Sequence, residues 1–254
     1  MDKIPKETKV IINKIKKVVS DFQKYNIDGY IVPKNDNFFS EYVKHDRLKI
    51  ISNFSGSAGF AIIFKNKNYL FVDGRYTIQA HRQSGKKFKV ITIPKKFPKD
   101  VLKTNKNIVL GFDPKLHTQR QLEYLFKNKK INLRSIDQNL IDLVWSKKPK
   151  ELIKPFYSIS KRSSGRSVKA KVGQIKKILL KNNVKYILIS APENVAWVLN
   201  IRGHDTSCSP IPNARLLITN NGDLDIFTNP KKLRKVAGIK LRVHDEKNIA
   251  KILS

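Results

Sequence analysis

The 254-residue sequence predicts an α/β protein in which one helix-strand-hairpin unit occurs twice along the chain. Three observations support this. An apolar stripe at helical spacing occurs twice, a short apolar strand follows each stripe, and an apolar hairpin follows each strand. We therefore divide the chain into residues 1–146 and 147–254. The second unit is expected to be truncated at its C-terminal end, because fewer strands follow its hairpin.

The first unit begins with a predicted helix. Its apolar residues fall at spacings of four, three and four, as one face of a helix requires: Ile11, Ile15, Val18 and Phe22. A turn at 26–29 leads into a strand at 30–32, which Pro33 ends. A small-residue loop and further elements follow: the loop at 53–59, strands at 61–64, 69–72, 90–93 and 108–112, and helices at 77–82 and 119–126.

The second unit repeats this order after a linker predicted at 145–167. The same four, three and four spacing recurs at Val168, Val172, Ile175 and Leu179. The later elements are a strand at 186–189, a turn at 200–203, a hairpin of 216–218 with 224–227, a strand at 240–243 and a helix from about 247.

The charge of the chain is its most unusual property. It carries 52 Lys and Arg against 20 Asp and Glu, a net charge of +32. One interpretation is a polyanionic partner such as nucleic acid. The other is a lysine-rich surface that reflects biased coding, since Lys, Asn and Ile are all abundant. We favour the second, because the basic clusters are short and do not alternate with aromatic residues.

Cellular location and redox state follow from what the sequence lacks. It has no apolar run of the ~18 residues that a membrane span needs, and no signal-peptide pattern, so we expect a cytoplasmic protein. Cys208 is the single cysteine, which excludes a disulfide within the chain. We expect Cys208 to be a small buried residue and not a nucleophile.

Catalytic motifs are scarce. No two histidines have metal-ligand spacing with a carboxylate, and CxxC, HExxH and phosphate-loop patterns are missing. The glycine-rich stretch 56–59 lacks dinucleotide and nucleophile-elbow spacing, so we interpret it as a tight loop. His204, Asp205 and Ser207 are interpreted as a turn, because neighbours on an extended chain point to opposite sides. No catalytic residue and no metal ligand is assigned.

The segment Asp73-Gly74-Arg75-Tyr76 is more specific, and two interpretations stay open. An arginine after a buried strand can hold a carboxylate or a carbonyl in its fork. Alternatively, Asp73 and Arg75 make a turn contact that only closes the hairpin.

Several motifs resemble a known family. They are NFSGSAG at 53–59, VDGRY at 72–76, GFDP at 111–114, NLIDLVW at 139–145, and ENVAWVLNIRG at 193–203 followed by Asp205 and Pro210. The earlier motifs are similar to the creatinase/aminopeptidase P N-terminal domain. The last resembles the second domain of three-domain Xaa-Pro aminopeptidases. The resemblance covers nearly the whole chain.

The resemblance implies two tandem creatinase-N-like domains, each a ribonuclease-H-like mixed sheet flanked by helices. In the family a third domain, with the pita-bread fold, binds two metal ions, usually manganese, and cleaves the bond before a penultimate proline. That domain has no counterpart here, so we expect no cofactor in this chain. The arginine of the Asp-Gly-Arg-Tyr motif contributes to peptide binding in the family, which makes Arg75 the expected substrate-binding residue. Arg202 is expected to have a structural or interface role.

Two hypotheses about function follow. The first is the non-catalytic N-terminal part of an Xaa-Pro aminopeptidase-like metallopeptidase, which serves substrate positioning and oligomerisation and is inactive alone. Its partners would be a peptide substrate and either a second copy or a separately encoded catalytic domain. The alternative is a stand-alone basic binding or scaffold protein that uses the same fold for polyanions.

Overall fold

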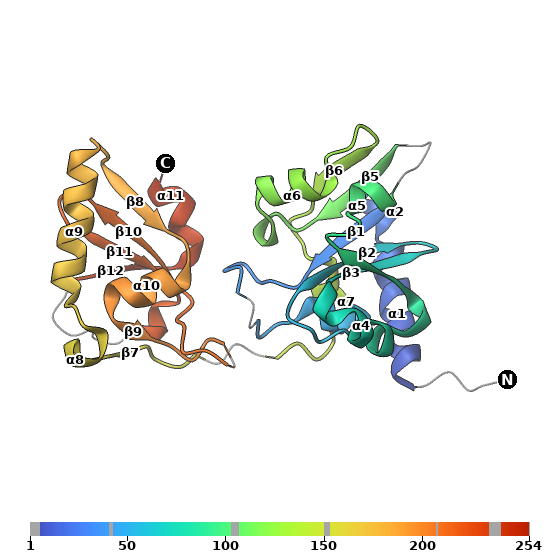
Figure 1. Cartoon of the computed structure of the whole chain (residues 1–254), viewed down its shortest axis with the longest axis horizontal. Helices are drawn as coiled ribbons and strands as arrows, with labels where there is room; N and C mark the ends of the chain where they lie inside the picture. The colour runs from blue at the N-terminus through green and yellow to red at the C-terminus, as the bar shows by residue number, and fades with distance from the viewer. Residues whose placement is uncertain are drawn as a thin grey trace. The chain divides into compact units, whose positions relative to one another are not determined.

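The computed structural model describes residues 6–40, 43–102, 107–149, 153–206, 208–233 and 240–253. The chain forms two compact units, Met1–Pro149 and Lys150–Ser254 (Figure 1). The sequence placed the division after residue 146. Each unit is described by itself below.

Unit 1 is built on a six-stranded mixed sheet in the order β4-β3-β2-β1-β5-β6. The strand β1 pairs antiparallel with β2 and parallel with β5, so it lies in the middle of the sheet. The strands are β1 Gly29–Pro33, β2 Gly59–Phe64, β3 Asn68–Asp73, β4 Phe88–Ile93, β5 Ile108–Phe112 and β6 Ile131–Ser135.

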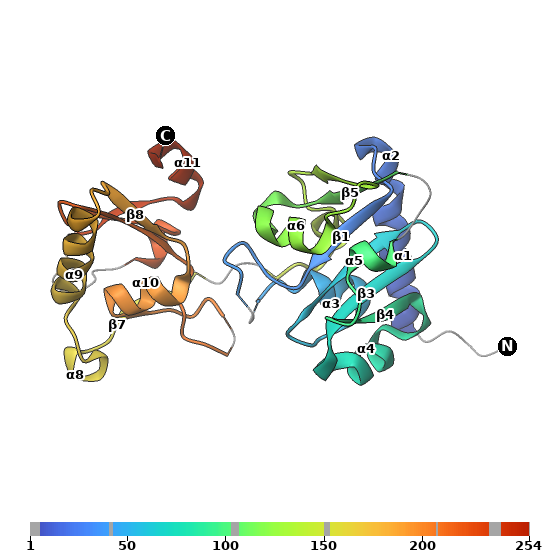
Figure 2. The same cartoon turned by 45° about the horizontal axis from the view of Figure 1, so that its top comes forward.

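Helices cover both faces of this sheet, as Figure 2 shows for α1 and α6. Side chains alternate along each strand, so Tyr30 and Val32 enter one core while Ile31 enters the other. The first face carries α1 Lys6–Ser20, α2 Phe22–Tyr25, α3 Arg47–Ser52, α4 Thr77–Ser84 and α7 Leu140–Val144, and the second carries α5 Pro98–Val101 and α6 Gln119–Phe126. Unit 1 therefore has two hydrophobic cores with the sheet between them.

Unit 2 has a four-stranded sheet in the order β12-β11-β10-β8. Helices α9 Val168–Lys181 and α10 Pro192–Leu199 contribute to one core with β10 and β11. The strands are β8 Tyr186–Ile189, β10 Arg215–Thr219, β11 Leu224–Phe227 and β12 Arg242–His244, and the remaining elements are β7 Tyr157–Ser158, α8 Lys161–Ser164, β9 Ile201–Arg202 and α11 Ile249–Leu253.

Short 3₁₀ helices connect several elements: η1 Gly74–Tyr76, η2 Gly85–Lys87, η3 Pro114–Leu116, η4 Pro230–Lys232 and η5 Glu246–Asn248. Asparagines in the left-handed region end three α-helices, at Asn26, Asn53 and Asn200. Asparagine tolerates this conformation better than most residues, which allows the chain to turn without glycine.

The predicted linker and the predicted turn at 200–203 differ from the structure. Tyr157 of the linker pairs with Arg202, and Ser158 pairs with Ile201, so the two segments form the small β7–β9 sheet. The linker also contains α8. Both segments are too short to show a period in sequence, and their pairing is a long-range contact.

Candidate functional site

A topological switch point lies in the middle of the unit 1 sheet. The parallel strands β1 and β5 are neighbours, yet the chain continues from β1 to α3 on one face and from β5 to α6 on the other. In α/β sheets, a crevice opens at the carboxyl ends of such strands, and ligands commonly bind there.

A hollow of about 540 Å³ lies at this end of the sheet. Its apolar lining includes Phe60, Ile93 and Leu125. Its polar lining comes from segments distant in sequence: Lys34 and Asn35 after β1, Ser57 before β2, Asp73 at the end of β3, and Gln121 of α6. The hollow therefore combines an apolar lining with several polar groups, the usual character of a small-ligand site.

The residues after β1 are fixed by contacts to distant segments. Lys34 forms an ion pair with Asp46, the residue that also caps the N-terminus of α3. The Nδ2 of Asn35 donates to the carbonyl oxygen of Leu116, at 2.9 Å, across the gap between β1 and η3. These contacts hold one rim of the hollow in place.

Arg75 lies on the turn that follows β3. Its backbone N and its Nε both donate to Oδ1 of Asp73, each at 2.9 Å. That side-chain hydrogen bond lowers the pKa of the Asp73 carboxyl from its usual value. The Arg75 side chain remains 71% exposed. The turn contact is therefore formed, and the same arginine lies at the surface beside a residue that lines the hollow.

Tyr76 connects this turn to the small-residue loop. Its hydroxyl lies 2.8 Å from Oγ of Ser57, and the Arg75 guanidinium lies over its ring at 5.5 Å. The ring also packs edge-on against buried Phe54. A Cβ atom at Gly56 would lie 2.3 Å from the Phe54 ring, so this packing requires glycine there.

His117 follows η3 at the carboxyl end of β5. Burial lowers the pKa of its imidazole to about 4, although nearby Asp113 opposes the effect. The ring packs edge-on against Phe112. His117 is therefore neutral at physiological pH.

The described residues do not form a metal site, because within the described ranges no three His, Cys, Asp or Glu side chains lie together. His204 and Asp205 have separate environments. His204 packs on Tyr157 with ring centroids 5.4 Å apart, whereas Asp205 pairs with Lys232. Ser207 lies outside the described residues. Cys208 is exposed, which contradicts the expectation of burial.

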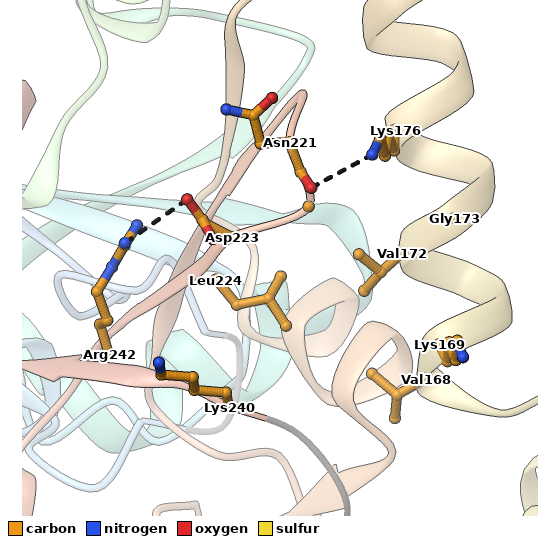
Figure 3. Close-up of a pocket in the computed structure, with 11 residues that line it drawn as sticks. Val168, Lys169, Val172, Gly173, Lys176, Asn221, Asp223, Leu224, Lys240 and Arg242 are labelled. Carbon is orange, nitrogen blue, oxygen red and sulfur yellow. Dashed lines mark hydrogen bonds and ion pairs between the residues drawn. The ribbon is translucent and has the colours of Figure 1, made fainter.

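Unit 2 has a second hollow, of about 550 Å³, between α9 and the β10–β11 turn (Figure 3). Val168 and Val172 of α9 point toward Leu224 and form its apolar floor. Basic residues surround this floor, but two of them are engaged: Lys176 donates to the Asn221 carbonyl at 3.4 Å, and Arg242 binds Asp223 and Asp225. This hollow lies at the amino ends of the parallel strands β11 and β12, which begin at Leu224 and Arg242, whereas the unit 1 hollow lies at the carboxyl ends of its strands.

Two family models match the chain, and both describe the creatinase/prolidase N-terminal domain. One covers residues 14–143 and the other residues 147–254. The chain belongs to the creatinase/prolidase N-terminal domain family. Each unit thus contains one domain of this family, and the fold predicted for both units, a mixed sheet flanked by helices, is confirmed.

Relatives of this creatinase/prolidase chain are named as Xaa-Pro aminopeptidases. A probable Xaa-Pro aminopeptidase P from Coprinopsis cinerea is 33% identical over 244 residues, which are 88% of this chain and 39% of that protein. Aminopeptidase P1 from Lotus japonicus is 32% identical over 203 residues, 77% of this chain and 31% of that protein. The chain therefore spans about two fifths or less of the length of these relatives.

A solved structure shows the same fold for this family member. The X-prolyl aminopeptidase of Caenorhabditis elegans, described as a cytosolic enzyme with a di-nuclear active site, has a TM-score of 0.87 at 24% identity. The match covers 96% of this chain and 43% of that one. No helix in the described ranges is long and apolar enough to cross a membrane.

Arg75 lies in a recognisable motif of the sequence, whereas Lys34, Asn35 and Gln121, which line the hollow, do not. Lys34 and Asn35 directly follow a buried strand, which is a usable signal for a site residue in an α/β fold. Ser57 was assigned only to a loop. Gln121 had no signal, because its position at the hollow depends on β5 lying next to β1.

Proposed function

We propose that the chain is the non-catalytic N-terminal part of an Xaa-Pro aminopeptidase-like metallopeptidase, which removes a residue that precedes proline. In this proposal Arg75 helps to hold the peptide. The observation that carries it is an exposed arginine on a fixed turn beside the switch-point hollow, in a chain made of two creatinase/prolidase N-terminal domains. A cytoplasmic location is part of the proposal, supported by the cytosolic X-prolyl aminopeptidase of similar fold.

The geometry supports binding. A guanidinium offers donors in a planar fork that match a peptide carbonyl or carboxylate. The bond from Nε to Asp73 fixes the direction of the fork, which reduces the entropy lost when a peptide binds. The hollow that Asp73 lines, at about 540 Å³, has room for a side chain of the peptide. Cleavage is assigned to a catalytic domain that the described residues do not contain.

Peptide binding by the purified chain tests the role of Arg75. Titration with an Xaa-Pro peptide, followed by NMR, should shift the amide signals of Ser57, Arg75 and Tyr76. Arg75→Ala should weaken the interaction about tenfold, because a charge-assisted hydrogen bond is lost. Arg82→Ala, on the exposed side of α4, is the matched control and should leave the affinity unchanged.

A cleavage assay tests the assignment of the chemistry. The chain is incubated with an Xaa-Pro peptide and manganese, and free amino acid is measured. We expect the chain to release amino acid no faster than a control that contains the peptide and manganese but no protein. Robust turnover by the chain alone would refute the proposal that cleavage requires a separate catalytic domain. Equal binding of the peptide by Arg75→Ala and by wild type would refute only the role of Arg75.

We further propose that the chain works in an assembly, either with a second copy or with a separate catalytic domain. Oligomerisation is the second role that we assign to these N-terminal domains. Sedimentation of the chain alone, and after mixing with the catalytic domain of a family member, measures both associations. A chain that stays monomeric in both conditions would contradict this part of the proposal.

The second candidate function is polyanion binding. The net charge of +32 favours it, as does the unit 2 hollow, where Lys169 and Lys240 lie around an apolar floor. Binding to a DNA duplex at increasing salt concentrations separates the two candidates, because phosphate contacts make the affinity fall steeply with salt. Tight, strongly salt-dependent binding would favour this second function.

A further inference from the structure

The hollow in unit 2 takes no part in the peptidase function proposed above. Its volume of about 550 Å³ is within the range of small-molecule sites. Figure 3 shows its two walls, α9 on one side and the β10–β11 turn with Lys240 and Arg242 on the other. A small ligand would therefore touch both the helix and the sheet of unit 2.

The floor of this hollow is the edge of the unit 2 core. Val168 and Leu224 belong to that core, and Val172 packs against it. In Figure 3 the two valines point toward Leu224, so apolar atoms face the hollow from both walls. Water has no hydrogen-bond partner on such a surface, so an apolar group gains free energy by displacing it.

Gly173 keeps the α9 wall of the hollow open. Glycine weakens a helix interior relative to most other residues, yet it occupies the interior of this 14-residue helix. Packing does not require it, because a Cβ atom there would have no heavy atom within 4 Å beyond its chain neighbours and the helix backbone. What the missing side chain leaves is space, at a point that lines the hollow.

The rim of the hollow is positively charged. Its basic residues are Lys169, Lys176, Lys240 and Arg242, and its acidic residue is Asp223, which pairs with Arg242. Lys169 and Lys240 are exposed, and neither forms an ion pair with the residues that the structure describes. The charge of these two lysines is therefore available to an anion that enters the hollow.

We propose that this hollow binds a small organic anion with an apolar body, of the class of aliphatic carboxylates. The chain would lie on Val168, Val172 and Leu224, and the carboxylate would stay at the rim with Lys169 and Lys240. An extended polyanion fits less well, because a phosphate backbone would contact the lysines but leave the apolar floor in water. The proposal does not depend on peptide binding by unit 1.

A series of carboxylates of increasing length tests the proposal on the intact chain. Acetate, butanoate, hexanoate and octanoate are titrated below their micelle-forming concentrations, and binding is followed by NMR at the methyl groups of Val168, Val172 and Leu224. The affinity should rise about three- to fourfold with each methylene that enters the hollow. Neutral octanamide should bind about tenfold or more weakly than octanoate, since it lacks the charge.

Either half of the proposal can fail in this series. Equal affinity for acetate and octanoate would overturn it, because the lysines would then bind an anion without any use of the floor. Equal affinity for octanamide and octanoate would also overturn it, because the charged rim would contribute nothing to recognition.

Two variants locate the ligand. Gly173→Leu should fill the hollow and weaken octanoate binding about tenfold or more, while the melting temperature stays the same or rises, because leucine favours a helix. The double variant Lys169→Gln with Lys240→Gln should weaken binding about tenfold. Lys177→Gln with Lys181→Gln is the matched control, since both are exposed on α9, do not line the hollow and remove the same charge.

The control pair should bind octanoate with nearly the affinity of the wild type. If the control pair loses as much affinity as the rim pair, the anion responds only to the net charge of the chain and the assigned site is wrong. Unchanged octanoate binding in Gly173→Leu would contradict the proposal in the same way, because the ligand would then lie elsewhere.

Discussion

The Nζ of Lys232 lies 2.9 Å from Oδ1 of Asp205, and both side chains are almost completely buried in unit 2. Oδ2 of Asp205 accepts a second hydrogen bond, from the backbone N of Asn213 at 2.7 Å. The carboxylate therefore joins η4 to the segment before β10. Asp205 belongs to the motif that resembles the second domain of Xaa-Pro aminopeptidases, and its role in the structure is to hold this part of unit 2 together.

Asp205→Asn should destabilise unit 2 by about 3–5 kcal/mol, because the substitution removes the negative charge that lies 2.9 Å from a buried ammonium. Chemical denaturation followed by circular dichroism measures the loss. The double variant Asp205→Asn with Lys232→Met should lose less than the two single variants together. Asp223→Asn, in an exposed ion pair with Arg242, is the matched control and should change stability by less than about 1 kcal/mol. Equal effects at positions 205 and 223 would contradict the prediction.

Lys171, like Lys232, is a buried cation in the described part of unit 2. Its Nζ donates to the carbonyl oxygen of Trp197 and to Oδ1 of Asn200, each at 2.6 Å, and lies 4.3 Å from the centroid of the Trp197 ring. Burial lowers the pKa of its ammonium. Lys171→Met should destabilise unit 2 by about 1–3 kcal/mol, since two acceptors at the end of α10 lose their donor.

Thermal unfolding and tryptophan fluorescence measure this effect. Lys169→Met, on the exposed side of the same helix, is the control and should change stability by about 0.5 kcal/mol or less. The fluorescence of Trp197 should change only in Lys171→Met, because only that variant removes the cation above the ring. An unchanged melting temperature in Lys171→Met would show that these two short hydrogen bonds contribute nothing net.

Gly56 permits the packing that supports the Arg75 turn. In Gly56→Ala, the new methyl group would overlap the rings of Phe54 and Tyr76, at 2.3 and 2.9 Å. We expect a loss of about 1–3 kcal/mol in unit 1, because Phe54 is fully buried and cannot move freely. Gly74→Ala is the control, since the nearest atom to its new Cβ, in Thr92, is 3.7 Å away. If both variants unfold at the same denaturant concentration as wild type, the close contact at Gly56 is not a constraint.

His117 should make unit 1 less stable in mild acid. Burial lowers the pKa of its imidazole from 6.5 to about 4 in the fold. The unfolded chain therefore takes up a proton first as the pH falls through this window, and folding stability decreases by roughly 1–3 kcal/mol between the two values. Above 6.5 both states are neutral at this position, so it adds no pH dependence there.

Two measurements check the prediction for His117. NMR titration of the imidazole should give a midpoint near 4, and denaturation across the window should show a steeper loss in wild type than in His117→Phe. A midpoint near the ordinary histidine value, or parallel pH profiles for the two proteins, would mean that the ring is accessible to water in solution.

Periodicity in the sequence was enough to predict much of the fold. The stripes of α1 and α9 were visible because one face of each helix is buried and the other is polar. The helix α10 was missed because its exposed face includes the apolar Trp197, so residues 195–199 form an unbroken apolar run in the sequence although they alternate in burial. The strand β6 was missed for the opposite reason, since Ile131 is the one buried residue of its five.

The candidate site was harder to predict than the fold. The contact between Asp73 and Arg75 is local, so the sequence could suggest it, and the structure contains it. Lys34, Ser57 and Gln121 come together around the hollow only because of the strand order, in which β5 crosses the sheet to pair with β1. No local pattern encodes that crossover. The exposure of Cys208 was likewise set by a turn that has no periodic signal.

Unit 1 should resist proteases better than unit 2. Its sheet has a hydrophobic core on each face, whereas the described part of unit 2 has a single core. Less apolar area is then withdrawn from water in unit 2, so its opened forms are more populated and a protease reaches them sooner. Brief digestion should leave unit 1 as the surviving fragment. In a cell, the lifetime of the whole chain would then depend on how often its second half opens.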